Sequence, residues 1–453
     1  VERAEAAGEE GESLDCLRGK LEQLDEELKK VLNLTIRSAT SGDVITKVRA
    51  KPTDKVETLR EFVLQALGED CVCVSMKFVV GAEILDPRAS LEEAGLARGD
   101  EVQLIQMPMR CLTACYDHTA RLWTLSGGPA AAAATGGSPR DSLIFHHDGP
   151  VLSAVLSRDG SSLLTVAAGG DGRLWCASSG EQLLKLSGEV MSHAELSPDG
   201  LHVVGASTGG AACIWSTETG AVVTSLVGHE DDVKAVSFSQ DGRLVATGSC
   251  DCSAGIWDAA SGRRLQTLSG HSDVVRSAVF SPCGGLVATA SMDGTARIWN
   301  AGSGECLHVL SGHSKALTEH CTFSSDGVSV LTASFDGTVR VWHSGTGELL
   351  ADIPVDNGVV NAAVFSPDAS SVMVASASEV LRLYSVSTGD CVRTFSGHED
   401  WVRSAGFSPD GTVICSGSYE GSVRIWNAAT GDCLLRLDGH RDEEAVVSIV
   451  LAG

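Results

Sequence analysis

The sequence predicts a mainly β protein in which most of the chain folds as a ring of short antiparallel sheets. Two observations predict this fold class. An aromatic residue recurs at spacings of 42, 42, 43, 42 and 42 residues, at Trp215, Trp257, Trp299, Trp342, Tyr384 and Trp426. The 50 glycines and the 43% share of hydrophobic residues also suit many short apolar strands joined by turns. A period in the forties that is made of several short strands is typical of a β-propeller.

Composition and charge argue against several classes of protein. The chain carries 34 basic and 59 acidic side chains, and its net charge of −25 disfavours binding to nucleic acid or to an anionic membrane. No stretch approaches the roughly 18 apolar residues of a membrane-spanning helix. The acidic N-terminus lacks the apolar region of a secretion signal. We therefore expect a cytoplasmic protein, with the nucleus as the alternative.

The 15 cysteines do not indicate a metal site. Close pairs such as Cys71/Cys73 and Cys250/Cys252 lack the C-x-x-C spacing of zinc ligands. We interpret the cysteines as buried thiols of a reducing compartment, and we expect no metal and no cofactor.

Residues 1–32 form an acidic segment with one heptad stripe. Leucines and a valine alternate at spacings of 3 and 4 residues over residues 13–32, at Leu14, Leu17, Leu21, Leu24, Leu28 and Val31. This pattern predicts a helix, but fewer than three heptads are marginal alone, so the helix must pack against something. Docking on its own domain and pairing with a partner helix or a second copy both remain open.

Residues 33–106 predict a small domain with the order ββαββ. A hairpin turns at Gly42, an amphipathic helix follows Thr53 and Asp54, and short strands end with Glu101–Gln106. This pattern resembles the ubiquitin-like β-grasp fold, including Pro52-Thr53-Asp54 and Gly99-Asp100-Glu101. The chain continues beyond Gln106 without a terminal Gly-Gly, so the domain cannot act as a conjugated modifier.

The ubiquitin-like resemblance also implies a contact face on this domain. The sheet face that ubiquitin uses to meet its partners falls on Phe78, Gln103 and Ile105. These residues could dock a partner of the ubiquitin-receptor type, or they could pack on the neighbouring domain.

From residue 108 to residue 453 the repeated unit resembles the WD40 repeat. Gly-His pairs begin at Gly228, Gly270, Gly312, Gly397 and Gly439, and turns of the form Phe-Ser-x-x-Gly begin at Phe238, Phe280, Phe323 and Phe407. The resemblance implies that each repeat is one blade of a WD40 β-propeller. It also implies a buried hydrogen-bonded chain in each blade that joins His, a Ser or Thr, Asp and Trp.

Four such structural networks can be assigned by residue. The sets are His229/Asp251/Trp257, His271/Asp293/Trp299, His313/Asp336/Trp342 and, from the two ends of the region, His440/Asp117/Trp123. Their recurrence argues against catalytic triads, because no nucleophile is singled out. No phosphate-binding loop, dinucleotide motif or nucleophile elbow is present either, so we expect no enzyme and no catalytic residue.

The two ends of the repeat region predict how the ring closes. Residues 110–124 lack a preceding Gly-His strand, whereas the C-terminus supplies Gly439-His440 and one strand over 446–451. Paired together, these segments complete one blade and remove exposed sheet edges. We therefore predict eight blades; seven, with residues 108–146 packed outside, is the alternative. Repeat three lacks the network His and Asp beside Trp215, repeat seven replaces both Gly-His and Asp-Gly and has Tyr384 at the Trp position, and Trp175 follows Asp171 by only four residues.

Mixed columns of the repeat predict a partner-binding rim. Lys234, Arg276 and Arg403 share one column, and a second column holds Asp232, Val274, Leu317, Val359 and Trp401. A third column precedes the blade Asp or Glu, and it holds Tyr116, Cys250, Met292, Phe335 and Tyr419. Aromatic and Arg side chains are enriched at binding hot spots. We interpret the rim as the contact for a short acidic or phosphorylated segment, with ordinary loop packing as the alternative.

The predicted function is a non-enzymatic scaffold that binds proteins or peptides. Two other roles remain open. The ubiquitin-like domain would suit an adaptor that selects substrates in ubiquitin-linked turnover. An adaptor in cytoskeletal or ciliary transport and assembly is the third, because eight-bladed WD40 adaptors occur there.

Overall fold

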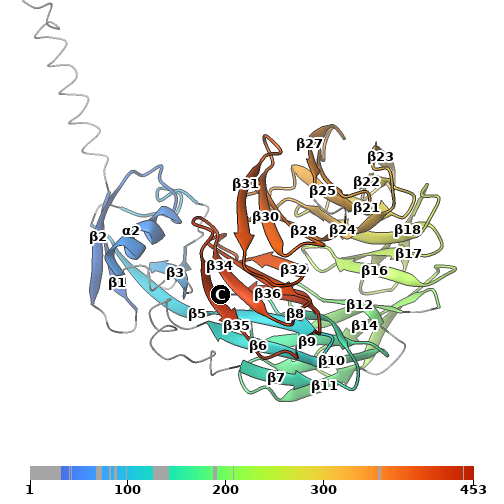
Figure 1. Cartoon of the computed structure of the whole chain (residues 1–453), viewed down its shortest axis with the longest axis horizontal. Helices are drawn as coiled ribbons and strands as arrows, with labels where there is room; N and C mark the ends of the chain where they lie inside the picture. Colours follow the sequence, from blue (N-terminus) through green and yellow to red (C-terminus); the bar gives the residue numbers. More distant parts are fainter. Residues whose placement is uncertain are drawn as a thin grey trace, which may run out of the picture. The chain divides into compact units, whose positions relative to one another are not determined.

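The computed structural model describes residues 32–39, 41, 43–67, 74–80, 83–85, 89–97, 99–125, 142–186, 191–207, 209–355, 359–441 and 443–452. Contacts between Cα atoms divide the chain into two compact units, Val1–Met107 and Pro108–Gly453 (Figure 1). The heptad helix predicted over residues 13–32 lies outside the described residues, except for Leu32, which begins a strand. Within the described residues, no helix is long and apolar enough to cross a membrane.

The described residues of the first unit form one mixed sheet and one helix. Its elements are β1 (Leu32–Ser38), β2 (Val44–Ala50), α2 (Thr58–Leu67), β3 (Val74–Val80), β4 (Glu83–Ile84) and the beginning of β5 (Glu101–Cys115). The sheet order is β2-β1-β5-β3-β4. β1 pairs antiparallel with β2 and parallel with β5, from Thr35 opposite Glu101 to Ser38 opposite Leu104. The central position of β5 joins the two halves of this sheet.

The core of the first unit joins α2 to one face of the sheet. Leu34 and Ile36 alternate with more exposed residues along β1, as the period of a half-buried strand requires. They share a buried cluster with Leu59 and Val63 of α2 and with Val102 of β5. Burial of this cluster holds the helix against the sheet.

The predicted contact face of the first unit needs a correction. Phe78 is only 5% exposed, and Met76, Phe78 and Val80 all pack in or against the core cluster. Alternate residues of a strand point to opposite faces, so Phe78 lies on the core side of β3. Gln103 is exposed, and the side chain of Ile105 lies outside the described residues. Phe78 therefore cannot serve as a partner contact in this fold.

The second unit is built from repeated sheets of four antiparallel strands. Seven of the sheets use consecutive strands, and their bounds are β8 (Val151–Leu156), β9 (Ser162–Ala167), β10 (Asp171–Cys176), β11 (Gln182–Leu186); β12 (Met191–Leu196), β13 (His202–Ser207), β14 (Ala211–Ser216), β15 (Val222–Val227); β16 (Val233–Phe238), β17 (Leu244–Ser249), β18 (Ser253–Asp258), β19 (Arg264–Ser269); β20 (Val275–Phe280), β21 (Leu286–Ser291), β22 (Ala296–Asn300), β23 (Cys306–Leu310); β24 (Leu317–Phe323), β25 (Ser329–Ser334), β26 (Thr338–His343), β27 (Leu349–Pro354); β28 (Val360–Phe365), β29 (Ser371–Ser376), β30 (Val380–Ser385), β31 (Cys391–Ser396); β32 (Val402–Phe407), β33 (Val413–Ser418), β34 (Val423–Asn427) and β35 (Cys433–Leu437). The repeats that lack the His and Asp of the network, β12–β15 and β28–β31, still form all four strands.

One further sheet of the second unit combines both ends of the repeat region. β36 (Val446–Ala452) pairs antiparallel with the later residues of β5, from Val446 opposite Cys115 to Ala452 opposite Arg110. β5 then pairs with β6 (Thr119–Leu125), and β6 pairs with β7 (Ser142–His146). The structure thus contains the pairing that the sequence predicts between residues 110–124 and 446–451.

The sheets follow one another through their innermost strands. β8, β12, β16, β20, β24, β28, β32 and β36 each contact the next one, and β36 also contacts β8 (Figure 1). Each core cluster lies between two neighbouring sheets; Ile214 of β14, for example, packs with Val233 of β16 and Trp257 of β18. Each sheet therefore buries apolar side chains against the next, and the arrangement fits a propeller.

Replacing Phe78 tests the corrected position of that residue. Phe78→Ala should leave a cavity in the core of the first unit and cost about 3–5 kcal/mol of its unfolding free energy. Hydrogen exchange of the full chain should then accelerate at the amides of residues 32–104 but not at those of 142–452. Gln103→Ala is the matched control, and it should leave both regions unchanged. Equal exchange in the two variants would contradict the core position.

Candidate functional site

A buried hydrogen-bonded chain recurs in the second unit. In the β20–β23 sheet, His271 Nδ1 lies 2.9 Å from Asp293, and its Nε2 lies 2.8 Å from Thr289 Oγ1. Trp299 Nε1 donates to the same hydroxyl at 2.9 Å. The same three contacts join His229, Asp251, Thr247 and Trp257, and also His313, Asp336, Thr332 and Trp342.

Two more sheets contain the same chain in altered form. In the β32–β35 sheet, Glu420 replaces Asp and Ser416 replaces Thr around His398, with both contacts at 2.7 Å. In the closing sheet, His440 Nδ1 lies 2.9 Å from Asp117, which is 323 residues away in sequence. Thr113 Oγ1 lies 2.9 Å from His440 Nε2 and accepts from Trp123 at 3.0 Å. The two ends of the repeat region thus share one polar network.

The networks hold a neutral histidine beside an ionised carboxylate. Burial lowers the pKa of His271, against the opposing effect of Asp293. For Asp293, burial disfavours ionisation, but hydrogen bonds from Thr295, the Ser272 amide and His271 outweigh it and lower the pKa to about 2. A neutral His271 that donates through Nδ1 and accepts at Nε2 satisfies every partner. Within this network, no side chain is left free to act as a base or a nucleophile.

A glycine and an arginine complete the network of the β20–β23 sheet. Arg297 lies 5.9 Å above the Trp299 ring and donates to the carbonyl of Gly270 at 2.8 Å. Gly270 has φ of +152°, and an added Cβ would lie 2.7 Å from Arg297 Nη1, so this position requires glycine. In the β16–β19 sheet Gly255 stands where most other repeats have Arg, and Arg264 of β19 covers the Trp257 ring instead.

The β8–β11 sheet departs from this pattern. His147 Nε2 contacts Thr165 at 2.8 Å, but its buried Nδ1 has no hydrogen-bond partner among the described residues. Asp171, displaced by the shortened turn, pairs with Arg173 and Lys185 instead. No glycine precedes His147, so the Gly-His pattern of the sequence does not include it. Its spacing of 18 residues to Thr165, the same as from His229 to Thr247, could have found it.

One group of side chains has the spacing of metal ligands. Among the described residues, the ligand atoms of Cys115, Asp117 and His440 lie within 4.8 Å of one another. Burial raises the pKa of the Cys115 thiol to about 12, and both nitrogens of His440 already hold hydrogen bonds. A metal would have to remove that proton and displace those bonds. The group therefore belongs to the closing network and does not fit a metal site.

The predicted rim consists of backbone-paired residues. The amide of each residue just before the blade Asp or Glu donates to a carbonyl in the loop that precedes the innermost strand. The donor–acceptor pairs, which we name the rim pairs, are Cys250–Asp232, Met292–Val274, Phe335–Ala316, Tyr419–Trp401 and Tyr116–Ala445, together with Ala377–Val359 in the sheet where Ser378 replaces the Asp. The structure corrects the column containing Leu317, which is buried. Ala316 takes that position because β24 contains one extra residue.

The rim pairs expose an arc of apolar side chains. Five of them are between 36% and 51% exposed, which are Tyr116, Met292, Phe335, Val359 and Trp401. Trp401 is the most exposed, and its ring meets Tyr419 edge-on, with centroids 6.1 Å apart at 86°. We call these five residues and Tyr419 the apolar arc. Tyr116 is the equivalent of Tyr419 in the neighbouring sheet, and among the described residues no ring contact joins Tyr116 to Trp401.

The cations of the rim differ in how they are paired. Lys234 is neutralised by Asp232, with Nζ and Oδ2 3.1 Å apart, whereas Arg276 and Arg403 are both partly buried. Arg403 donates to the Asn361 carbonyl at 3.1 Å, and Asn361 donates to the Val402 carbonyl at 2.8 Å. Within the described residues Arg403 forms no ion pair. Arg403, beside Trp401, is therefore the rim cation best placed to meet an acid.

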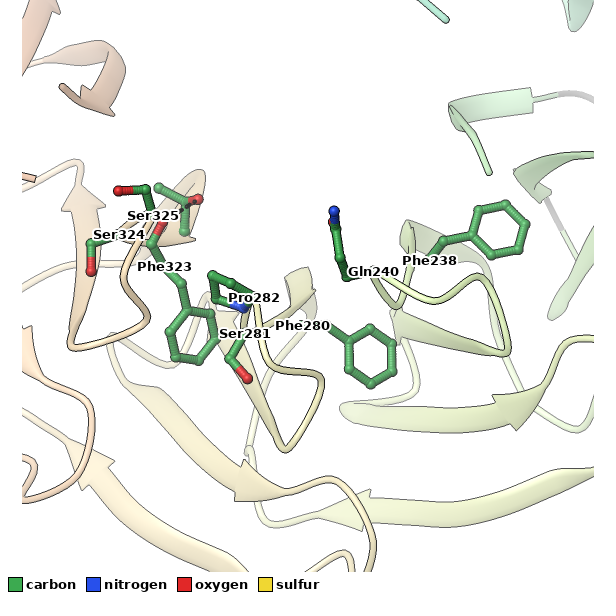
Figure 2. Close-up of a pocket in the computed structure, with 9 residues that line it drawn as sticks. Phe238, Gln240, Phe280, Ser281, Pro282, Phe323, Ser324 and Ser325 are labelled. Atoms are coloured by element: carbon green, nitrogen blue, oxygen red, sulfur yellow. Dashed lines mark hydrogen bonds between the residues drawn. The ribbon is translucent and has the colours of Figure 1, made fainter. Parts of the chain in front are cut away.

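A small cavity lies at the other ends of the innermost strands. It has about 190 Å³ and lies between the turns that follow β16, β20 and β24 (Figure 2). Phe238, Phe280 and Phe323 contribute to its lining, with Gln240 and Ser325 at the turns. These strands begin at the rim, so the cavity lies on the opposite side. The sequence predicts no binding role for the turns that follow β16, β20 and β24.

Replacing a histidine in two different sheets tests the networks. His271→Leu should strand Asp293 and Thr289 without partners, at about 1–3 kcal/mol for each buried group. His147→Leu should cost less, because it breaks one hydrogen bond and removes an unpaired buried nitrogen. Urea unfolding of the two variants and the parent should rank their stabilities in this order. A larger loss from His147→Leu would contradict the assignment.

Acid should destabilise the protein in two stages. Burial lowers the pKa of His147 to about 4, and it lowers those of His229, His271, His313, His398 and His440 as well. Below the unfolded-state pKa of about 6.5, the histidines of the unfolded chain bind more protons than those of the folded chain. The unfolding free energy therefore decreases as the pH is lowered. A second fall should begin near pH 4, because Asp251, Asp293 and Asp336 have pKa values of about 2. Urea unfolding between pH 7.5 and 4 checks the first stage, which His147→Leu should diminish; a constant midpoint would contradict it.

Comparison with known proteins identifies the repeat. The family described as WD domain, G-beta repeat matches residues 220–258, 262–300, 304–343 and 389–427. No curated protein matches the chain. Among solved structures, the crystal structure of the computationally designed Ika8 protein is 27% identical, covers 67% of this chain and 90% of its own, and has a TM-score of 0.60. The chain therefore carries WD40 repeats, and its sheets of four antiparallel strands fit a WD40 propeller.

Proposed function

We propose that the protein is a non-enzymatic scaffold that binds a protein or peptide partner at the apolar arc. WD40 repeats indicate a protein-interaction scaffold at the family level, and WD40 domains typically bind other proteins or peptides. The observation that carries the proposal is Trp401, a large ring that is 51% exposed at the rim and contacts Tyr419. Exposed aromatic side chains of this kind anchor partners at hot spots.

The proposed scaffold is an eight-bladed propeller preceded by a ubiquitin-like domain. The cyclic contacts of the innermost strands, from β8 through β36 and back to β8, support eight blades over seven. The order β2-β1-β5-β3-β4, with β1 parallel to β5 and α2 on one face, supports the ubiquitin-like assignment of residues 33–106. The WD40 family match covers only four repeats, so the number of blades and the ubiquitin-like domain are both part of the proposal.

The partner that suits this rim has an apolar side chain next to an acidic group. Trp401 and Tyr419 provide the apolar contact, and Arg403 provides donors that no acid in the described residues occupies. Lys234, already paired with Asp232, would contribute less. A carboxylate or phosphate on the partner would meet Arg403 through charge-assisted hydrogen bonds. Because the protein carries a net charge of −25, an acidic partner would be attracted locally at Arg403, and this contact would fix the orientation in which the partner binds.

A second role in ubiquitin-linked turnover has weaker support. The strand order of the first unit favours it, but the burial of Phe78 removes one of the three residues expected on its contact face. A ubiquitin-like fold also serves as a plain interaction module, because fold alone does not specify function. The scaffold role at the rim is therefore the better supported proposal.

Replacing rim residues tests the proposed function. Trp401→Ala should weaken binding of the captured partner at least about tenfold, because it removes the anchor. Arg403→Gln should weaken binding less and reduce its dependence on salt, because it removes a charge contact. Affinity capture from cells with quantitative mass spectrometry identifies the partner, and titration calorimetry then measures each affinity.

The control is Val392→Ala, which removes an exposed apolar side chain from the outer strand β31. It should leave binding unchanged. Equal recovery of every partner by the parent and by the Trp401→Ala and Arg403→Gln variants would refute the rim as the binding surface.

A further inference from the structure

Two buried cysteines face each other where the ring closes. Cys111 lies on β5, in the sheet that combines both chain ends, and Cys415 lies on β33 of the preceding sheet. Their Sγ atoms are 3.1 Å apart, although the residues are 304 positions apart in sequence. Both are free thiols, and both are fully buried.

The cysteines occupy positions that hold aliphatic residues at the other junctions. Cys111 is opposite Trp123, and Cys415 is opposite Ile425. At the junction of the β16–β19 and β20–β23 sheets, the equivalent residues are Val287 and Ala246, which share a core cluster. The other equivalent pairs, each within one core cluster, are Leu112/Leu163, Leu164/Val203, Val204/Val245, Ala288/Val330, Leu331/Val372 and Met373/Ile414. Cysteine replaces both members of the pair at the closing junction.

We propose that Cys111 and Cys415 form a redox site whose disulfide locks the closing junction. A disulfide needs its sulfur atoms about 2.05 Å apart, so the two atoms must approach by about 1 Å. The bond would close a loop of 304 residues and join the first strand of the repeat region to its last complete sheet. Strand β36 pairs with β5 through Leu451 opposite Cys111 and also contacts β33, so joining β5 to β33 would hold β36 in place at the junction.

The oxidant that the site requires is a hydroperoxide. One thiolate attacks a peroxide oxygen and becomes a sulfenic acid, with release of water from hydrogen peroxide. The second sulfur attacks the sulfenic sulfur, forms the S–S bond and releases a second water. Two thiols and one peroxide thus give one disulfide and two waters, with two electrons transferred to the peroxide.

Burial makes this reaction depend on opening of the junction. Neither thiol is accessible in the closed ring, and burial raises the pKa of Cys415 well above its usual range. The thiolate is the reactive species, so peroxide must act when β36 separates transiently from β5 or before the strands have paired. Oxidation would therefore record opening and then prevent it. In a reducing compartment the two cysteines would remain free thiols.

Oxidation of the full chain tests the redox site. The purified protein is treated with hydrogen peroxide at a urea concentration just below its unfolding transition, then mapped by proteolysis and mass spectrometry without reduction. The expected product is a peptide pair linked through Cys111 and Cys415. The oxidised protein should unfold at higher urea, and dithiothreitol should reverse the shift.

Matched variants separate the disulfide from general effects of oxidation. Cys111→Val combined with Cys415→Ala places at this junction the residues found at Val287 and Ala246, so this variant should fold and lose the shift. Cys321→Ala removes another buried cysteine, and it should keep both the shift and the linked peptide. Failure to form the link while the exposed Cys283, Cys391 and Cys433 are oxidised would overturn the proposal. A link that leaves the urea midpoint unchanged would overturn the locking role.

Discussion

The second unit depends on the antiparallel pairing of β36 with β5. Every sheet buries apolar side chains against its neighbours, so an open row of sheets would leave apolar faces in water at both ends. Because one sheet takes strands from both ends of the repeat region, this pairing supplies the missing neighbour for the first sheet and the last sheet at once. The network of His440 with Asp117 adds buried polar contacts across the same pairing. Folding of the whole unit is thereby linked to one contact between residues that are distant in sequence.

The recurring networks separate the structural part of each sheet from the part available to partners. In the sheets with His271 or His229, every polar atom of the His–Thr–Trp chain has a partner, so these residues are committed to the fold. The β28–β31 sheet forms without the His and Asp of the network, so the strands can assemble without that hydrogen-bonded chain. Residue types vary at the rim, because the rim pairs are formed by backbone atoms and leave the side chains free to differ. The sheet pairs with Trp401 through its backbone carbonyl and does not require the exposed ring, which the proposed binding role would explain.

The sequence predicted the repeated sheets well because the networks impose fixed spacings. Thr or Ser precedes Trp by ten residues in each complete network, and strand pairing leaves little freedom in that distance. Two predicted contact positions were wrong because sequence spacing does not reveal an extra residue within a strand or the face of a strand that is buried. One extra residue in β24 moved Ala316 into the place assigned to Leu317, and the side of β3 that faces the helix placed Phe78 in the core. The contact between Cys111 and Cys415 joins positions 304 residues apart, and no local pattern encodes it.

The proposed binding surface spans the junction on which the fold depends. Trp401 and Tyr419 belong to the β32–β35 sheet, and Tyr116 belongs to the sheet that contains β36. A partner that contacts both sheets can bind only while the junction is closed, because opening separates the two halves of its surface. By mass action such a partner stabilises the closed ring in proportion to its affinity and concentration. The same linkage lowers the frequency of opening through which an oxidant reaches Cys111 and Cys415. Binding at the rim and oxidation at the junction would therefore act on one equilibrium, with a bound partner slowing disulfide formation and a formed disulfide preserving the binding surface.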